Sequence, residues 1–211
     1  MLIELVNHNP DIERLLKRGF ALREDSSYLV VRDIPYLDSK LDRQLGAFVT
    51  KLVDMDGKRV QQDDHQVYFA GGTPHGLDGQ PIPNLGGGAH TLALSKTDVV
   101  VQRSFSNKRK NDRGELIPFK DFFEKIEHYV AVISGPAIEK YGGVEPYTFK
   151  IDPETAGDSV FKLRDTLTSR AEIGDLTPVL NNDVVAVIGL GGTGAYLLDF
   201  LIKTPVKEIR G

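Results

Sequence analysis

The stretch VVAVIGLGGTGAYLLDFLI, residues 184–202, contains the most specific pattern in the sequence. Its first five residues form the apolar, mostly β-branched run that is typical of a central parallel strand. The glycines that follow fit G-x-G-x-x-G at Gly189, Gly191 and Gly194, and apolar residues then continue as in a helix. We therefore predict a strand, a glycine turn and a helix, which together open a Rossmann-like α/β nucleotide-binding domain.

Each glycine of this motif has its own expected role. The first permits a tight turn, the second lets a phosphate approach the backbone, and the third lets the helix pack close to the strand. Amide groups at the start of the helix, together with the positive end of its dipole, would bind the phosphates. The candidate cofactor-binding residues are Gly189, Gly191, Gly192, Thr193 and Gly194. The alternative is a glycine turn with a structural role only.

The residues after this helix predict a second strand. Thr204-Pro205-Val206 forms a turn, and residues 207–210 begin the next strand. In this fold an acidic residue at the end of that strand binds a ribose or a metal-bound nucleotide. In this sequence that acidic residue would follow Gly211. We therefore expect the chain to be the N-terminal part of a larger enzyme, with no metal ligands of its own.

The residues upstream predict a mixed domain that contains both helices and strands. Asn9-Pro10-Asp11 is a helix-start pattern, and Gly19 is a typical C-terminal stop. Residues 71–88 are so rich in glycine and proline that we expect turns or a long exposed loop there. Within it, GTPHGLDGQPIP, residues 72–83, is the candidate surface for contact with a partner. The other expected elements are helices over 10–18, 118–134 (ended or kinked by Gly135-Pro136), 157–169 and 171–183, and strands over 28–34 (ended by Pro35), 47–53, 66–70, 90–94 and 98–103.

Composition excludes several classes of function. The formal net charge is -4, which argues against nucleic-acid binding, and the basic run of Lys108, Arg109, Lys110 and Arg113 is interpreted as a solvated loop. The chain has no cysteine, which excludes disulfides, zinc-thiolate sites and a thiol nucleophile. No apolar run approaches the length of a membrane span, so we expect a cytoplasmic protein.

Two weaker constellations of residues fit ordinary structural roles better than functional ones. Three histidines with acidic neighbours could suggest a metal site, but their spacing fits no compact ligand pattern: His65, His75 and His90. A serine hydrolase would need a nucleophile elbow, and no G-x-S-x-G precedes either serine that could pair with His128, namely Ser104 and Ser106. We therefore expect neither a metal site nor a serine hydrolase.

The final 28 residues, VVAVIGLGGTGAYLLDFLIKTPVKEIRG, resemble the opening of the ThiF, MoeB and ubiquitin-activating-enzyme superfamily. The hallmark of that superfamily is a strand followed by GxGGxG, and Gly192 supplies the additional glycine. The resemblance implies a loop that binds ATP, assisted by Mg²⁺, in a homodimeric adenylyltransferase. Such an enzyme activates the C-terminal glycine of a ubiquitin-like or sulfur-carrier protein.

A second resemblance concerns the preceding segment SRAEIGDLTPVL, residues 169–180. It is similar to the leading helix of the same superfamily, in which an arginine reaches the nucleotide of the partner subunit. Arg170 matches that arginine and is the candidate catalytic residue. The alternative is a surface arginine on a packing helix.

Residues 1–168 resemble, more loosely, an uncharacterised domain that precedes ThiF domains in bacterial proteins, often encoded beside ubiquitin-like and conjugating-enzyme-like genes. The segments that prompt this are YLVVRDIPYLD, DDHQVYFAGGTPHGLDGQPI, RSFSNK and FFEKIEHYVAVISGPA. We expect an α+β accessory domain at 1–168, followed at 169–211 by the first strand-loop-helix of a Rossmann-like α/β domain. A carrier protein and a conjugating-enzyme-like protein are the implied partners.

Three functional hypotheses remain open from the sequence. The leading one is the ThiF-like adenylyltransferase, although the later aspartate, lysine, arginine and acceptor cysteine of that superfamily are missing, so this chain alone should be inactive. An NAD-dependent oxidoreductase fragment uses the same fold. A non-catalytic protein-interaction module would need the glycine loop only for structure.

Overall fold

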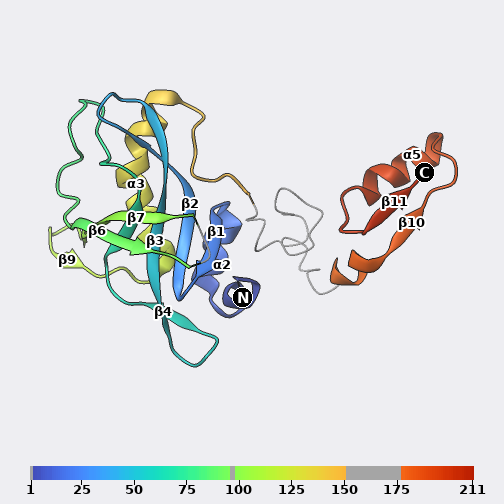
Figure 1. The fold of residues 1–211 in the computed structure, drawn as a ribbon, viewed down its shortest axis with the longest axis horizontal. Helices are drawn as coiled ribbons and strands as arrows, with labels where there is room; N and C mark the ends of the chain where they lie inside the picture. Colours follow the sequence, from blue (N-terminus) through green and yellow to red (C-terminus); the bar gives the residue numbers. More distant parts are fainter. Residues whose placement is uncertain (1, 96–97, 151–176) are drawn as a thin grey trace. The chain divides into compact units, whose positions relative to one another are not determined.

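A computed structural model describes residues 2–95, 98–150 and 177–211 of the chain (Figure 1). The chain divides into two compact units, Met1–Phe149 and Lys150–Gly211, and each is described by itself. Three features expected from the sequence lie outside the described residues: Arg170, the domain boundary at residues 168/169, and the helix over 157–169. So does the first part of the helix expected over 171–183, whose last part is a 3₁₀ helix, η1, Thr177–Asn182.

The first unit is a mixed α/β fold built on a seven-stranded antiparallel sheet, which agrees with the expected mixture of helices and strands. The strand order is β1-β2-β3-β5-β7-β6, and β4 pairs with β3. The strands are β1 Ala21–Asp25, β2 Tyr28–Leu37, β3 Arg43–Asp54, β4 Val60–Gln62, β5 Val67–Ala70, β6 Gly88–Ala93 and β7 Val100–Phe105. A separate short hairpin consists of β8 Arg109–Lys110 and β9 Leu116–Ile117. The basic run therefore lies partly in a β-hairpin instead of a loop.

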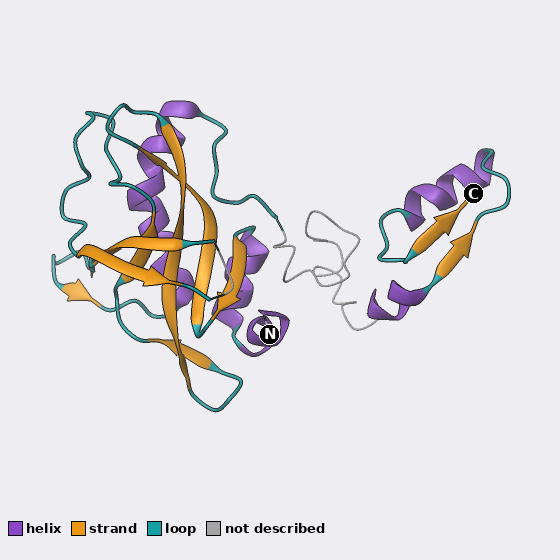
Figure 2. Ribbon diagram, viewed as in Figure 1, coloured by secondary structure: helices purple, strands orange, loops and turns teal. Residues whose placement is uncertain are grey.

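Three helices cover one face of this sheet, as Figure 2 shows. They are α1 Leu2–His8, α2 Pro10–Arg18 and α3 Phe122–Tyr141. Alternate residues of the central strands point toward them because successive side chains of a strand face opposite sides. The resulting core includes Ile12 and Leu15 of α2, Leu29, Val31, Phe48 and Phe69 of the strands, and Ile126, Tyr129 and Ile133 of α3.

The opposite face of the sheet has a smaller core of its own. Val30, Val49 and Val101 are fully buried there, although they belong to β2, β3 and β7. The connection between β6 and β7 also reaches the turn between β1 and β2, where the buried carboxylate of Asp25 accepts hydrogen bonds from Ser95 N at 3.1 Å and Ser95 Oγ at 3.0 Å. The sheet is therefore coiled, with its two ends fastened to each other.

The helix α2 begins and ends where the sequence predicts. Gly19 adopts a left-handed conformation (φ 107°) and closes the helix through backbone bonds to Leu15 and Leu16. Asn9 occupies the N-cap position, but its side chain makes no cap bond. Its amide instead accepts from Val60 N at 2.8 Å and donates to Lys58 O at 3.2 Å, so that it joins the helices to the β3–β4 hairpin.

The strand β2 does not end at Pro35, contrary to the prediction from the sequence. It continues to Leu37 after an irregularity between Val31 and Ile34. The part of β2 after Arg32 pairs with β3 but not with β1 in the described sheet. A proline is compatible with such a one-sided stretch, because the amide hydrogen that it lacks would have no neighbouring strand to bond to.

The helix α3 also differs from its prediction at both ends. It begins at Phe122, where Asp121 is the N-cap and its carboxylate accepts from Glu124 N at 2.8 Å. It then continues through Gly135-Pro136 to Tyr141. Tertiary contacts support the last turns, since Lys140 Nζ and Tyr141 OH donate to Leu41 O at 2.8 and 3.0 Å. Among the described helices, none has both the length and the apolar character that crossing a bilayer requires.

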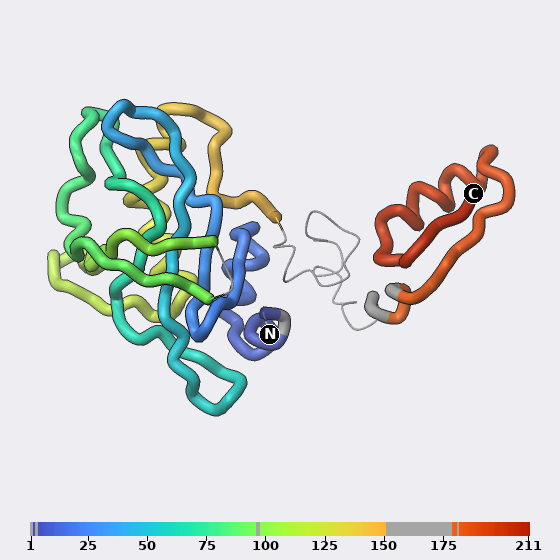
Figure 3. The backbone as a smooth tube through the Cα atoms, in the orientation of Figure 1, coloured from blue at the N-terminus to red at the C-terminus, as the bar shows by residue number. Residues whose placement is uncertain are grey.

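The second unit contains a strand, a loop, a helix and a parallel strand in succession. Figure 3 traces the path of their backbone in orange and red. They are β10 Val184–Ala186, α5 Gly192–Leu201 and β11 Glu208–Arg210. Val185 pairs with Ile209, so the predicted second strand is present and lies beside the first. Val187 and Val206 are buried, whereas Ile188 is 100% exposed and Phe200 66% exposed.

Two polar side chains interrupt the apolar face of α3. Lys125 is fully buried, and its ammonium donates to Asp64 O at 3.0 Å and Gln66 O at 3.3 Å. The buried hydroxyl of Tyr129 donates to His65 O at 2.9 Å and accepts from Asn107 N at 2.9 Å. Both side chains therefore hold the chain where β5 begins, and Tyr129 also holds it where β7 ends.

We expect Tyr129→Phe to destabilise the first unit by about 2–3 kcal/mol, because the buried partners of the hydroxyl lose their hydrogen bond. Urea unfolding followed by circular dichroism would measure the change. The matched control is Tyr141→Phe, whose hydroxyl bonds to Leu41 O from an exposed ring, and it should cost less than about 1 kcal/mol. Equal losses in the two variants would contradict the role given to Tyr129.

We also expect the stability of this unit to rise with pH through Lys125. Burial, opposed by the nearby Asp64 and Asp63 carboxylates, lowers the pKa of Lys125 to about 8, whereas an unfolded lysine has a pKa of about 10.4. Between these values the unfolded chain binds more protons, so stability increases with pH, by roughly 2 kcal/mol from about pH 7.5 to about pH 10. Urea unfolding across this range should show the rise in the native protein and in the control Lys120→Met, but not in Lys125→Met.

Candidate functional site

The glycine loop joins β10 to α5 with the geometry of a tight turn. The chain leaves β10 at Ala186, and Gly189 has φ +87°, which favours glycine. The helix begins at Gly192, inside the motif, and not at Ala195 as the sequence suggested. Gly192 and Thr193 therefore belong to the first turn of α5, and Gly191 is its N-cap.

The second and third glycines of the motif have different surroundings. A Cβ placed on Gly194 would lie 1.9 Å from Gly189 O, so no side chain fits there. Among the described residues, no atom lies within 4 Å of a Cβ placed on Gly191. The loop thus closes tightly on itself at Gly194 and leaves open space beside Gly191, which is where a phosphate would have to approach the backbone.

The start of α5 presents backbone donors to that open space. Gly194 N donates to Gly191 O at 2.8 Å, but no side chain from the described part of the chain caps the helix. The first amides of a helix have no partner within the helix, so those of Gly192 and Thr193 depend on solvent or on a ligand. With the positive end of the helix dipole behind them, they suit an anionic group.

The remaining candidate residues are placed as follows. Arg170 lies outside the described residues. No group of three or more metal-ligating side chains occurs in the described ranges. His75 and His90 are not joined to His65: His75 Nδ1 contacts Thr73 O at 2.8 Å, and His90 stacks on Tyr68 with ring centroids 4.7 Å apart.

The structure also contains a serine–histidine pair that the sequence did not indicate. Ser106 Oγ lies 2.8 Å from His65 Nε2, while His128, the histidine considered from the sequence, contacts Asn107 Oδ1 at 2.7 Å. Burial and the Lys108 charge lower the pKa of His65, and burial lowers that of His128, so both rings are largely neutral at pH 7. Ser106 and His65 come together because β7 pairs with β5, with Val67 opposite Phe105.

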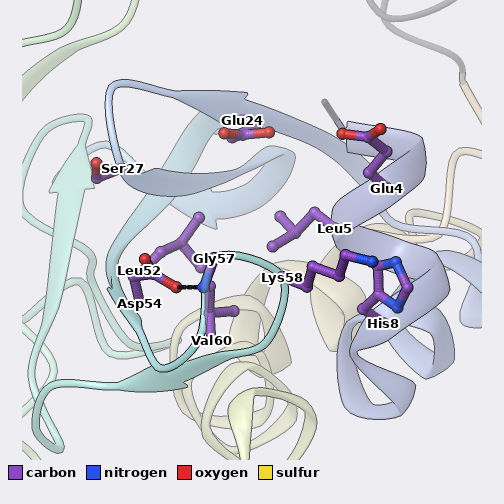
Figure 4. A pocket seen from close by; sticks show the side chains of 10 residues that line it. All are labelled: Glu4, Leu5, His8, Glu24, Ser27, Leu52, Asp54, Gly57, Lys58 and Val60. Atoms are coloured by element: carbon purple, nitrogen blue, oxygen red, sulfur yellow. Dashed lines mark hydrogen bonds between the residues drawn. The ribbon is translucent and has the colours of Figure 1, made fainter.

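A cavity of about 410 Å³ lies between α1, the β1–β2 turn and the β3–β4 hairpin (Figure 4). Leu5, Leu52 and Val60 form its apolar part, and Glu4, Glu24 and Asp54 carry carboxylates around it. Asp54 accepts from Gly57 N at 2.6 Å and so shapes the turn beside the cavity. This excess of carboxylates is unsuited to phosphate binding, which leaves the glycine loop as the better candidate for a nucleotide.

Residues 10–166 match a protein family described as a domain of unknown function, DUF6791. The match covers the first unit from α2 onward and ends before the glycine loop. No curated protein and no solved structure matches the chain.

The two glycines make a testable pair. Gly194→Ala should destabilise the second unit, because its methyl group would overlap Gly189 O, and should lower the protection of α5 amides from hydrogen exchange by about tenfold or more. Gly191→Ala should change that protection by less than about threefold, since the space beside it is open. Similar protection of α5 in both variants would mean that the loop does not close as described.

Proposed function

The chain belongs to the DUF6791 family, and we propose that it is the N-terminal part of a ThiF-like, ATP-dependent adenylyltransferase. In this proposal β10, α5 and β11 open a Rossmann-like domain, and the loop from Gly189 to Gly194 binds the phosphates of ATP. The enzyme would activate the C-terminus of a ubiquitin-like or sulfur-carrier protein. ATP, with Mg²⁺, supplies the adenylyl group for this reaction.

One observation carries the proposal: the open space beside Gly191 lies next to the uncapped amides of Gly192 and Thr193. Exposed glycines elsewhere, such as Gly88, also have free space beside them, but that space does not lie at the N-terminus of a helix. The parallel pairing of β10 with β11 further supports it, because a strand–helix–parallel-strand unit is the building block of nucleotide-binding α/β sheets.

The apolar surface of the second unit supports the idea of a larger domain. Ile188, in the loop after β10, is 100% exposed, and Tyr196 and Phe200 of α5 are 73% and 66% exposed. Parallel sheets are normally covered on both faces, so these side chains suit contact with further strands and helices. Because the residues that complete catalysis in this superfamily are not in the chain, we expect it to bind nucleotide without catalysing adenylation.

The first unit would then serve as an accessory domain that positions a carrier protein, a conjugating-enzyme-like protein or a partner subunit, in a homodimeric cytoplasmic enzyme. The runner-up is an NAD-dependent oxidoreductase, since the same loop geometry also suits the pyrophosphate of NAD. The third hypothesis, an interaction module, is favoured only if the loop binds no nucleotide.

Amide resonances of Leu190 to Gly194 provide the test. We expect Mg·ATP to shift them in a saturable manner, and Gly191→Asp to abolish the effect by placing a negative side chain where the phosphate approaches. Gly88→Asp, at an exposed glycine of β6 with open space beside it, should leave binding within about twofold of the native value. Preferential binding of NAD would favour the oxidoreductase, and binding of neither nucleotide to a folded loop would rule out both enzymes.

A further inference from the structure

A second cavity, of about 400 Å³, lies in the first unit beside the β8–β9 hairpin. One wall is the connection from Gln62 to His65, between β4 and β5. The other consists of Lys108 and the segment Leu116–Phe119, which leads from β9 toward α3. None of these residues belongs to the glycine loop, so the cavity is independent of the nucleotide proposal.

Hydrogen bonds fix both walls before any ligand binds. Lys125 and Tyr129 hold the first wall through Asp64 O and His65 O, at 3.0 and 2.9 Å. Gln62 Nε2 donates to Phe119 O at 2.6 Å and so ties the first wall to the second. A cavity with such fixed walls suits a small ligand, because little ordering is needed on binding.

The two sides of the cavity differ in chemistry. Leu116, Ile117, Pro118 and Phe119 provide an apolar side, and Leu116 is 59% exposed although it is a large aliphatic residue. The polar and charged lining residues are Lys108, which shares a wall with this apolar segment, and Asp63, Asp64 and His65 of the first wall. The cavity can therefore accommodate an apolar group and a polar group of the same molecule.

The charges around the polar side favour an anion of single charge. Asp63 pairs with Lys51 at 3.4 Å, and Asp64 accepts from Gln66 N at 2.7 Å while the buried Lys125 ammonium lies beside it. Asp63 and Lys51 balance each other in charge, and so do Asp64 and Lys125. Lys108 has no hydrogen bond or ion pair with the described residues, so its positive charge is in excess. The His65 ring is largely neutral at pH 7 and adds no charge.

We propose that this cavity binds a carboxylate attached to an apolar group of about amino-acid size. The carboxylate pairs with Lys108, and the apolar group packs against Leu116–Phe119. Two sources share this chemistry, namely a free apolar acid and the C-terminal residue of a peptide. A phosphate ester is a poorer match, because a second negative charge would lie near Asp63 and Asp64 without a further cation.

The test uses N-acetyl-phenylalanine and its amide, and the peptide acetyl-Gly-Gly-Phe with a free or amidated C-terminus. Amide chemical shifts of Lys108 and Leu116–Phe119 would report binding. We expect the free carboxylates to bind about tenfold or more tightly than the amides. Tighter binding of the peptide than of the single residue identifies a peptide C-terminus as the source, and equal binding identifies a free acid.

Lys108→Gln and Lys110→Gln form the matched pair of variants, since both lysines are exposed but only Lys108 lines the cavity. Lys108→Gln should remove the preference for carboxylate over amide, whereas Lys110→Gln should retain it. Leu116→Ala should weaken acid and amide alike. The proposal is overturned if acid and amide bind equally to the native protein, if neither binds at millimolar concentration, or if the two lysine variants lose the preference equally.

Discussion

The first unit depends on two polar side chains in an otherwise apolar interface. Lys125 and Tyr129 project from α3 and satisfy backbone groups of residues 64–66, 105 and 107, which are far apart in the sequence. Apolar packing positions the helix through the fit of its side chains, whereas hydrogen bonds also require particular donors and acceptors to lie at particular places. The directed bonds select one position of the helix, and through it the separation of the walls of the second cavity.

The elements that the sequence predicted well are those whose signals are local. The helix α2 carries both of its own end signals, and β5 is a short apolar run bounded by polar residues. The strand β1 was not predicted because its polar residues interrupt the apolar pattern that indicates a strand. Arg23 and Asp25 are nevertheless buried, which becomes apparent only once β1 has paired with β2. Pro35 and Pro136 predicted ends that tertiary contacts override.

For the candidate sites, too, local signals could be predicted from the sequence and tertiary contacts could not. The glycine motif is contiguous, so its turn and helix could be predicted, although the start of α5 at Gly192 could not. The pairing of Ser106 with His65 depends on the register between β5 and β7, and no local pattern indicates that register. The isolation of Lys108 likewise emerges only once each neighbouring charge has found its partner.

Pro35 draws attention to how this edge of the sheet is closed. After Arg32 the strand β2 no longer pairs with β1, and unpaired strand edges can recruit strands from other molecules. Here, however, the four residues from Ile34 to Leu37 are buried, and Leu37 O accepts a hydrogen bond from His75 N at 2.9 Å. The glycine- and proline-rich segment that contains His75 therefore shields this edge from foreign strands.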